Sequence, residues 1–296
     1  MRIGRFEVEL LDAGHFRMDG GMLFGVVPKV MWEKHRRADE LNRIDMCTNS
    51  LLVRDGQRNL LIEAGMGTKH GPKERERWMI SEGDELLASL RRHGLEPKDI
   101  DVVIQTHLHF DHAGGLTRWE PDGRVVPTFA RARHLVQRRE WDFAVSPDPR
   151  SRASFLSRDW EPVADAGLFD LVDGSQQIHP GIELRLTGGH TPGHQVVVIE
   201  SNGEAAVFMG DLIPFEQHLR TAWVAATDLL PLQTLEEKVR LREEAYNHRY
   251  LVVFGHEPDH PWGHLQEPGD RLVPLERSAQ QGQRQQGGDS QAGALD

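Results

Sequence analysis

The chain has 296 residues, of which 38% are hydrophobic and 27% charged, as in a soluble globular protein that can bury a sizeable core. Its formal net charge of -11 argues against nucleic acid or an anionic membrane as the main partner. No signal peptide or membrane-spanning apolar run is visible, and the single Cys47 excludes an intramolecular disulfide, so a cytoplasmic location is expected. We expect residues 1–276 to form one domain. Residues 277–296 are rich in Gln and Gly and almost without apolar residues, so we expect a disordered tail.

Alternating apolar residues and turn signals predict a chain rich in short strands. The strands are expected over residues 3–11, 22–27, 50–53, 59–63, 102–104, 125–126, 134–136, 182–186, 196–199, 205–209 and 251–254. Asp55-Gly56 and Asn202-Gly203 predict tight hairpin turns between neighbouring strands.

Helices are expected at fewer places. A capping-box-like sequence at Ser81 precedes an amphipathic stretch that Gly94 ends, and a second capping box at Thr234 precedes a longer one. Residues 138–144 predict a further short helix. Residues 29–44 are charged and predict either a surface helix or a lid over a pocket.

A dense cluster of metal-ligand residue types follows the apolar run 102–104. His107 and His109 are two residues apart, so on an extended backbone their side chains share one face. Asp111 and His112 are adjacent and point apart unless the chain turns, which the following Ala-Gly-Gly permits. One segment could therefore serve two metal ions.

Other strands end in the same way. Glu63, Asp211 and His256 each follow an apolar strand and have a glycine within two residues, and a glycine-rich loop supplies His190. Imidazole and carboxylate ligands without thiolate suit zinc, and also iron, manganese or cobalt. The candidate ligands are His107, His109, Asp111, His112, His190, Asp211 and His256.

Seven ligands exceed the three that a single catalytic zinc typically takes from the protein. Two divalent ions that share one bridging carboxylate account for all seven. Such a pair, about 3.5–4 Å apart, can hold a bridging hydroxide that attacks a carbonyl or phosphoryl centre. Asp111 is the candidate catalytic residue that relays a proton to the leaving group.

The pattern His107-x-His109-x-Asp111-His112, followed by single ligands in Gly-His190, Gly-Asp211 and Gly-His256, resembles the metallo-β-lactamase superfamily over residues 3–265. The resemblance implies an α/β (α+β) fold, the αββα sandwich of two mixed sheets with helices on the outer faces. It also implies metal ligands in two sets. The first set is His107, His109 and His190, the second is Asp111, His112 and His256, and Asp211 bridges both.

Three further stretches, residues 21–29, 42–44 and 210–214, resemble the branch of N-acyl homoserine lactonases and methyl parathion hydrolase-like enzymes. For that branch, an extension over residues 17–45 implies a lid or a homodimer contact. The resemblance makes Met22, Phe24, Phe215 and His218 candidate substrate-pocket residues, and Trp32 a pocket or interface residue. Ordinary packing is the alternative for each of them.

The chain departs from this family in two places. Glu63 stands where the family usually has an aspartate that orients a ligand histidine, and its extra methylene moves the carboxylate. No tyrosine lies between Asp211 and Tyr246, where lactonases carry one that assists at the substrate carbonyl, so His218 is the nearest alternative donor. Three other histidines have no role in this scheme and are expected at the surface: His194, His260 and His264.

The leading functional hypothesis is a dinuclear hydrolase that opens lactone rings, with N-acyl homoserine lactones as the first substrates to test. Phosphotriester hydrolysis is the alternative, because a bridging hydroxide does not choose between carbon and phosphorus. Glyoxalase-II-like thioester cleavage is less favoured, since no helical domain follows the last ligand. A metal-binding scaffold without catalysis is the alternative of another class. The expected partner is a small ester or lactone.

Overall fold

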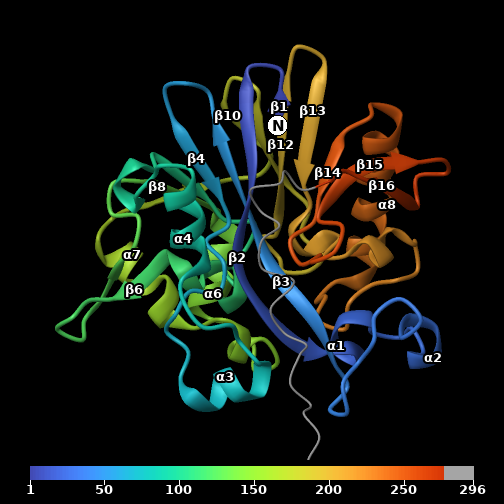
Figure 1. Ribbon diagram of the computed structural model, residues 1–296, viewed down its shortest axis with the longest axis horizontal. Helices are drawn as coiled ribbons and strands as arrows, with labels where there is room; N and C mark the ends of the chain where they lie inside the picture. The colour runs from blue at the N-terminus through green and yellow to red at the C-terminus, as the bar shows by residue number, and fades with distance from the viewer. Residues whose placement is uncertain (277–296) are drawn as a thin grey trace, which may run out of the picture.

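The computed structural model describes residues 1–276, which form two seven-stranded sheets packed face to face (Figure 1). The predicted tail at 277–296 lies outside the described residues. The first sheet has the order β1-β2-β3-β4-β5-β8-β9. Its strands are β1 (Arg2–Ile3), β2 (Phe6–Asp19), β3 (Arg43–Arg54), β4 (Asn59–Ile62), β5 (Val102–Ile104), β8 (Arg133–Gln137) and β9 (Phe169–Val172).

The second sheet runs from β10 to β16 in sequence order. Its strands are β10 (Gln176–His179), β11 (Ile182–Leu186), β12 (Gln195–Ser201), β13 (Glu204–Phe208), β14 (Leu251–Val253), β15 (Trp262–Gln266) and β16 (Arg271–Pro274). A separate hairpin joins β6 (Thr117–Trp119) to β7 (Val125–Pro127). Both large sheets are mixed, because β4, β5, β8 and β9 pair in parallel, as do β13 and β14.

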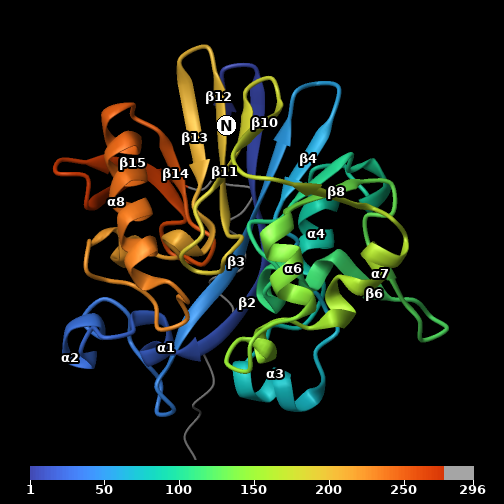
Figure 2. The same cartoon turned by 180° about the vertical axis from the view of Figure 1, so that it is seen from behind.

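Helices cover the outer faces of both sheets (Figures 1 and 2). The first sheet is covered by α4 (Glu85–Arg92), α6 (Arg138–Val145) and α7 (Glu161–Asp165), and the second by α8 (Pro231–Asn247). The shorter helices are α1 (Gly20–Phe24), α2 (Lys29–Trp32), α3 (Pro72–Trp78), α5 (Phe110–Ala113), and the 3-10 turns η1 (Pro97–Asp99), η2 (Gly114–Leu116), η3 (Arg152–Ser154), η4 (Ser157–Asp159), η5 (Gly210–Leu212) and η6 (Glu216–Leu219). The predicted αββα sandwich is confirmed.

The alternation along single strands explains the layers. In β4, Leu60 and Ile62 belong to the core between the sheets, whereas Leu61 packs under the helices with Leu87 and Leu90 of α4. Successive side chains of a strand point to opposite faces, so one strand contributes to two cores. None of the described helices is both long and apolar enough to cross a membrane.

The N-terminal region differs most from the predicted elements. The strand expected over 22–27 is wrong: residues 20–24 form α1, because the Asp19 carboxylate accepts hydrogen bonds from Gly21 N and Met22 N and so caps a helix. The segment 29–44 is helical only in α2, and β3 begins at Arg43. β2 and β3 are therefore longer than predicted and pair from Glu7–Arg54 to Asp19–Arg43.

The start of α8 was also misplaced. The predicted capping residue Thr234 lies inside the helix and is buried, and the helix begins at Pro231. Proline is favourable in the first turn because its φ is already helical and its missing N–H has no partner there. The strands β6, β9, β10, β15 and β16 were not predicted, since their short apolar runs lie among charged and turn residues.

Candidate metal centre

The segment after β5 carries four of the seven candidate ligands. The chain is extended through His109 (φ -64°, ψ 153°) and then turns into α5, which contains Asp111 and His112. This is the turn that the two-ion hypothesis required. The glycines that follow have no room for a side chain, because a Cβ at Gly114 would lie 1.9 Å from the carbonyl oxygen of Met66. α5 is thereby packed directly against the turn that follows β4.

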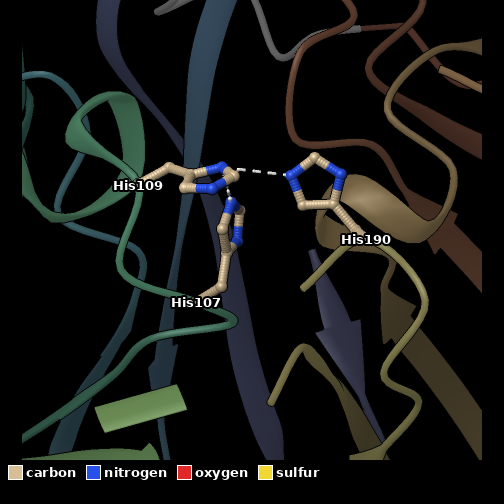
Figure 3. A group of neighbouring side chains, drawn as sticks. All are labelled: His107, His109 and His190. Carbon is tan, nitrogen blue, oxygen red and sulfur yellow. Dashed lines mark hydrogen bonds between the residues drawn. The ribbon is translucent and has the colours of Figure 1, made fainter. Parts of the chain in front are cut away.

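His107, His109 and His190 form the first cluster (Figure 3). Nδ1 of His109 lies 3.0 Å from Nε2 of His107 and 3.1 Å from Nε2 of His190. His190 Nδ1 donates to the Asp228 carboxylate at 2.9 Å. A carboxylate only accepts, so in the neutral ring the lone pair of His190 lies on Nε2 and faces the other two rings.

His112 and His256 form the second cluster, together with Asp111. Nδ1 of His112 donates to Glu63 Oε2 at 2.9 Å, and Nδ1 of His256 donates to the backbone carbonyl of Cys47 at 2.8 Å. In the neutral rings both Nε2 lone pairs therefore point inward, where the two atoms are only 3.0 Å apart. Two facing lone pairs repel each other, and a cation between them removes that repulsion.

Asp211 lies between the clusters and presents one oxygen to each. Oδ1 is 3.2 Å from His112 Nε2 and 3.0 Å from His256 Nε2. Oδ2 is 3.2 Å from His190 Nε2 and 4.0 Å from His107 Nε2. Oδ1 is buried and has no hydrogen-bond partner of acceptable geometry. Inward-facing nitrogen lone pairs around an unsatisfied carboxylate oxygen fit a pair of divalent ions.

The pKa shifts of the candidate ligand histidines reflect the charges that surround them in each cluster. Burial, together with neighbouring histidines, lowers the pKa of His107 and His109 well below the usual value, which favours the neutral, ligating form. Burial also disfavours the charged form of His112, but Asp211, Asp111 and Glu63 outweigh it and raise the pKa of that ring well above its usual range. The second cluster thus favours positive charge, from a proton or a cation.

Asp111 lies at the edge of the second cluster. Its Oδ2 is 3.9 Å from His112 Nε2 and 3.7 Å from His256 Nε2, and its side chain keeps 10% of its surface exposed. The carboxylate can therefore face both the ligands and an incoming molecule.

Three of the four candidate pocket residues are packed into an apolar cluster, in which the Phe215 ring lies 6.2 Å from the ring of the candidate ligand His256. Phe24, Phe215 and His218 are buried and stacked, with ring centroids of Phe24 and His218 5.1 Å apart, whereas Met22 is 41% exposed. Nε2 of His218 donates to the Leu23 carbonyl at 2.8 Å. Burial lowers the pKa of His218 to about 3, so the ring is neutral. Its one N–H is therefore already used within the packed cluster.

Three supporting residues differ from the prediction or carry no signal in the sequence, and a fourth agrees with it. His194 was expected at the surface, but it is buried and its Nε2 accepts the backbone N–H of Asp211 at 3.0 Å. Its position four residues after His190 in one loop was the available signal. Asp228 and Glu140 carry no motif, and only the fold brings them to the site. Glu63 does contact a ligand histidine, as its resemblance implied.

The other two histidines lie nearer the surface. His260 is exposed, and His264 is half-buried with Nδ1 3.1 Å from the Tyr250 carbonyl. Neither belongs to a metal-binding group of the described residues.

Comparison with known proteins places this geometry in a family. The profile of the Metallo-beta-lactamase superfamily matches residues 46–265. N-acyl homoserine lactonase AiiA of Bacillus thuringiensis subsp. kurstaki is 28% identical over 178 residues, and the match covers 60% of this chain and 64% of AiiA. The chain therefore spans less than two thirds of that relative. N-acyl homoserine lactonase AttM of Rhizobium radiobacter is 27% identical over 195 residues, covering 62% of this chain and 68% of AttM.

Solved structures agree over a larger part of the chain. A "probable metal-dependent hydrolase" from Staphylococcus aureus is 34% identical, with a TM-score of 0.87, and the match covers 92% of this chain and 97% of that one. AidC, a dizinc quorum-quenching lactonase in complex with a product, is 21% identical with a TM-score of 0.76, covering 93% and 96%; this likeness concerns the fold alone. The profile, the fold and the ordered ligand motif agree: this chain belongs to the metallo-β-lactamase superfamily.

Proposed function

We propose that this chain is a dinuclear metal-dependent hydrolase that opens lactone rings, with N-acyl homoserine lactones as the first candidates. The observation that carries the proposal is Asp211, whose two oxygens face separate histidine clusters. A carboxylate in that position can bridge two ions, and the ordered ligands of the family fill both sides. The lactonase names of AiiA and AttM support the choice of lactones.

Bound divalent ions would polarise the lactone carbonyl and make hydroxide available near neutral pH. The residues of the chain supply orientation and proton transfer. Asp228, Glu63 and the Cys47 carbonyl each fix one ring so that its ligating nitrogen faces inward. Asp111 would take the proton that the attacking water gives up and pass it to the alkoxide that leaves when the ring opens, because its carboxylate is both near the ligands and partly exposed.

Apolar side chains beside the ligands support a substrate with an acyl chain. Trp78 stacks on Phe110 with centroids 4.6 Å apart, and Phe110 directly follows His109. Met18, Trp78, Ile80 and Leu156 are only partly buried at the edge of the same apolar cluster. An acyl chain that covers these side chains would gain hydrophobic binding energy.

The test is hydrolysis of a lactone panel by protein reconstituted with zinc, iron, manganese or cobalt. Asp111→Asn is expected to lower kcat/KM about 100-fold or more, because it removes the proton relay. Asp122→Asn, a change of the same type at an exposed ion pair, should leave activity unchanged. Absence of ring opening above the Asp111→Asn level would refute lactone hydrolysis. Turnover of a phosphotriester alone would favour the alternative substrate, and two bound ions with no turnover would favour the scaffold.

We also propose that residues 17–45 form a homodimer contact. Five apolar side chains of this extension are exposed: Met22, Val26, Val30, Met31 and Leu41. Apolar groups gathered on one segment favour association. Light scattering during size-exclusion chromatography should give twice the mass of the chain, and Val26→Asp with Val30→Asp should reduce it; a monomeric wild type would refute the contact.

A further inference from the structure

Glu140 is a fully buried carboxylate near the first cluster that has no place in the ligand motif. It lies in the first turn of α6. Oε1 accepts the backbone N–H of Leu108 at 2.9 Å, and Oε2 accepts the hydroxyl of Thr191 at 2.5 Å. The backbone N–H of Gly193 also donates to this carboxylate. Three donors to one carboxylate offset much of the cost of burying its charge.

The positions of these donors give Glu140 its significance. Leu108 stands between the ligands His107 and His109, and Thr191 directly follows the ligand His190. One carboxylate therefore joins the two loops that supply all three members of the first cluster. Gln195 also links these segments, because its backbone N–H donates to the carbonyl of Thr106, one residue before His107 and five residues after His190 in the other loop.

Close packing at the same point supports this reading independently of the hydrogen bonds. A Cβ at Gly193 would lie 2.1 Å from the backbone nitrogen of Glu140, so α6 and the loop 190–194 touch through their backbones. The helix cannot slide along the loop without a steric clash, so the Glu140 carboxylate is held at a fixed position relative to the loop 190–194.

We propose that Glu140 is a positioning residue for the first metal site. Its carboxylate sets the separation of the loops 107–109 and 190–191, and so the geometry in which His107, His109 and His190 hold an ion. The second cluster has supports of its own, Glu63 and the Cys47 carbonyl. Loss of the Glu140 carboxylate therefore weakens the first site and largely spares the second. The inference rests on the dinuclear site of the proposed function.

The experiment uses the full chain loaded with cobalt(II), whose visible absorption reports ligand geometry. Glu140→Ala should release one of its two ions to a chelator at least about tenfold faster than wild type, with a changed absorption band. Glu140→Gln keeps the shape and one acceptor oxygen, so it should restore much of the loss. Leu90→Ala in α4 removes a buried apolar side chain outside the two ligand loops and serves as the control for destabilisation alone.

Wild-type release rates and spectra in Glu140→Ala, or equal loss of both ions, would overturn the proposal. If Glu140→Ala does not fold, Thr191→Val removes one of the three donors and should still speed release of one ion several-fold. A wild-type release rate in Thr191→Val would then overturn the proposal. A wild-type chain that binds no cobalt would refute the dinuclear site itself, whereas a wild type with two ions and an unaffected Glu140→Ala would refute only the role of Glu140.

Discussion

Replacing Glu63 by glutamine should weaken the second metal ion selectively. The carboxylate serves two donors, His112 Nδ1 at 2.9 Å and Thr106 N at 2.6 Å, and it is 2% exposed. A glutamine side chain has one acceptor oxygen and one NH₂ group, so it can satisfy only one of these donors. If His112 loses its acceptor, its ring is free to carry the hydrogen on Nε2, the atom that faces Asp211.

The size of the expected loss in metal affinity follows from that tautomer change. Removing an outer hydrogen-bond partner of a ligand histidine typically costs 10- to 100-fold in metal affinity, or about 1.4–2.8 kcal/mol. Chelator competition on the full chain would give the two dissociation constants separately. Glu244→Gln is the matched control. Glu244 lies on α8 and accepts a hydrogen bond from the Tyr250 hydroxyl at 2.9 Å, and it contacts none of the candidate ligands in a hydrogen bond. Unchanged affinity in Glu63→Gln, or an equal fall at both sites, would refute the reasoning.

Three further predictions concern stability. Removing metal with a chelator should lower the thermal midpoint by several degrees in a metal-concentration-dependent way, because ions that bind only the folded chain stabilise it; an unchanged midpoint would contradict the metal site. Burial lowers the pKa of His134 to about 4, below its unfolded value of about 6.5, so its contribution to stability is present above pH 6.5 and is lost as the pH falls towards 4. Urea unfolding should show a loss of about 2 kcal/mol from this group between pH 7 and pH 5, absent in His134→Gln; equal pH dependence in the two proteins would contradict it. Gly114→Ala should destabilise the chain by several kcal/mol and release both ions, because its Cβ would clash with Met66 O, whereas Gly56→Ala at an open turn should keep the metals and cost far less; a metal-loaded, stable Gly114→Ala would contradict the packing.

The candidate ligands could be recognised in the sequence because metal chemistry restricts residue types at short spacing. Four candidate ligands lie within the six positions from His107 to His112. The single candidates His190, Asp211 and His256 each adjoin a glycine, at the end of an apolar strand or in a loop. The sandwich was implied by the resemblance to the family that the ligand motif carries. The fold is confirmed. The seven candidate ligands are brought together by the structure, and their binding of metal stays a prediction.

The supporting shell could not be predicted because it is assembled only by tertiary structure. Asp228 lies 38 residues from His190, and Glu140 lies 32 residues from Leu108 and 51 from Thr191. Nothing in the local sequence distinguishes these carboxylates from the many exposed ones. The helix α1 was missed for a different reason: an Asp19 cap overrode the strand-like residues 22–27, whose pattern was too short to decide between the two.

The hydrogen bond between His256 and Cys47 has a consequence for how this site can vary. The acceptor at position 47 is the main-chain carbonyl, so the hydrogen bond to the ring does not depend on the chemistry of the side chain at that position. Strand β3 also joins the His256 segment through Cys47 N to His256 O at 3.3 Å and Asn49 N to Gly255 O at 2.8 Å. A one-residue insertion or deletion in this part of β3 would move every one of these groups out of register. The identity of residue 47 is therefore limited by its burial and not by the bond to His256, whereas the length of β3 before it is fixed by the register.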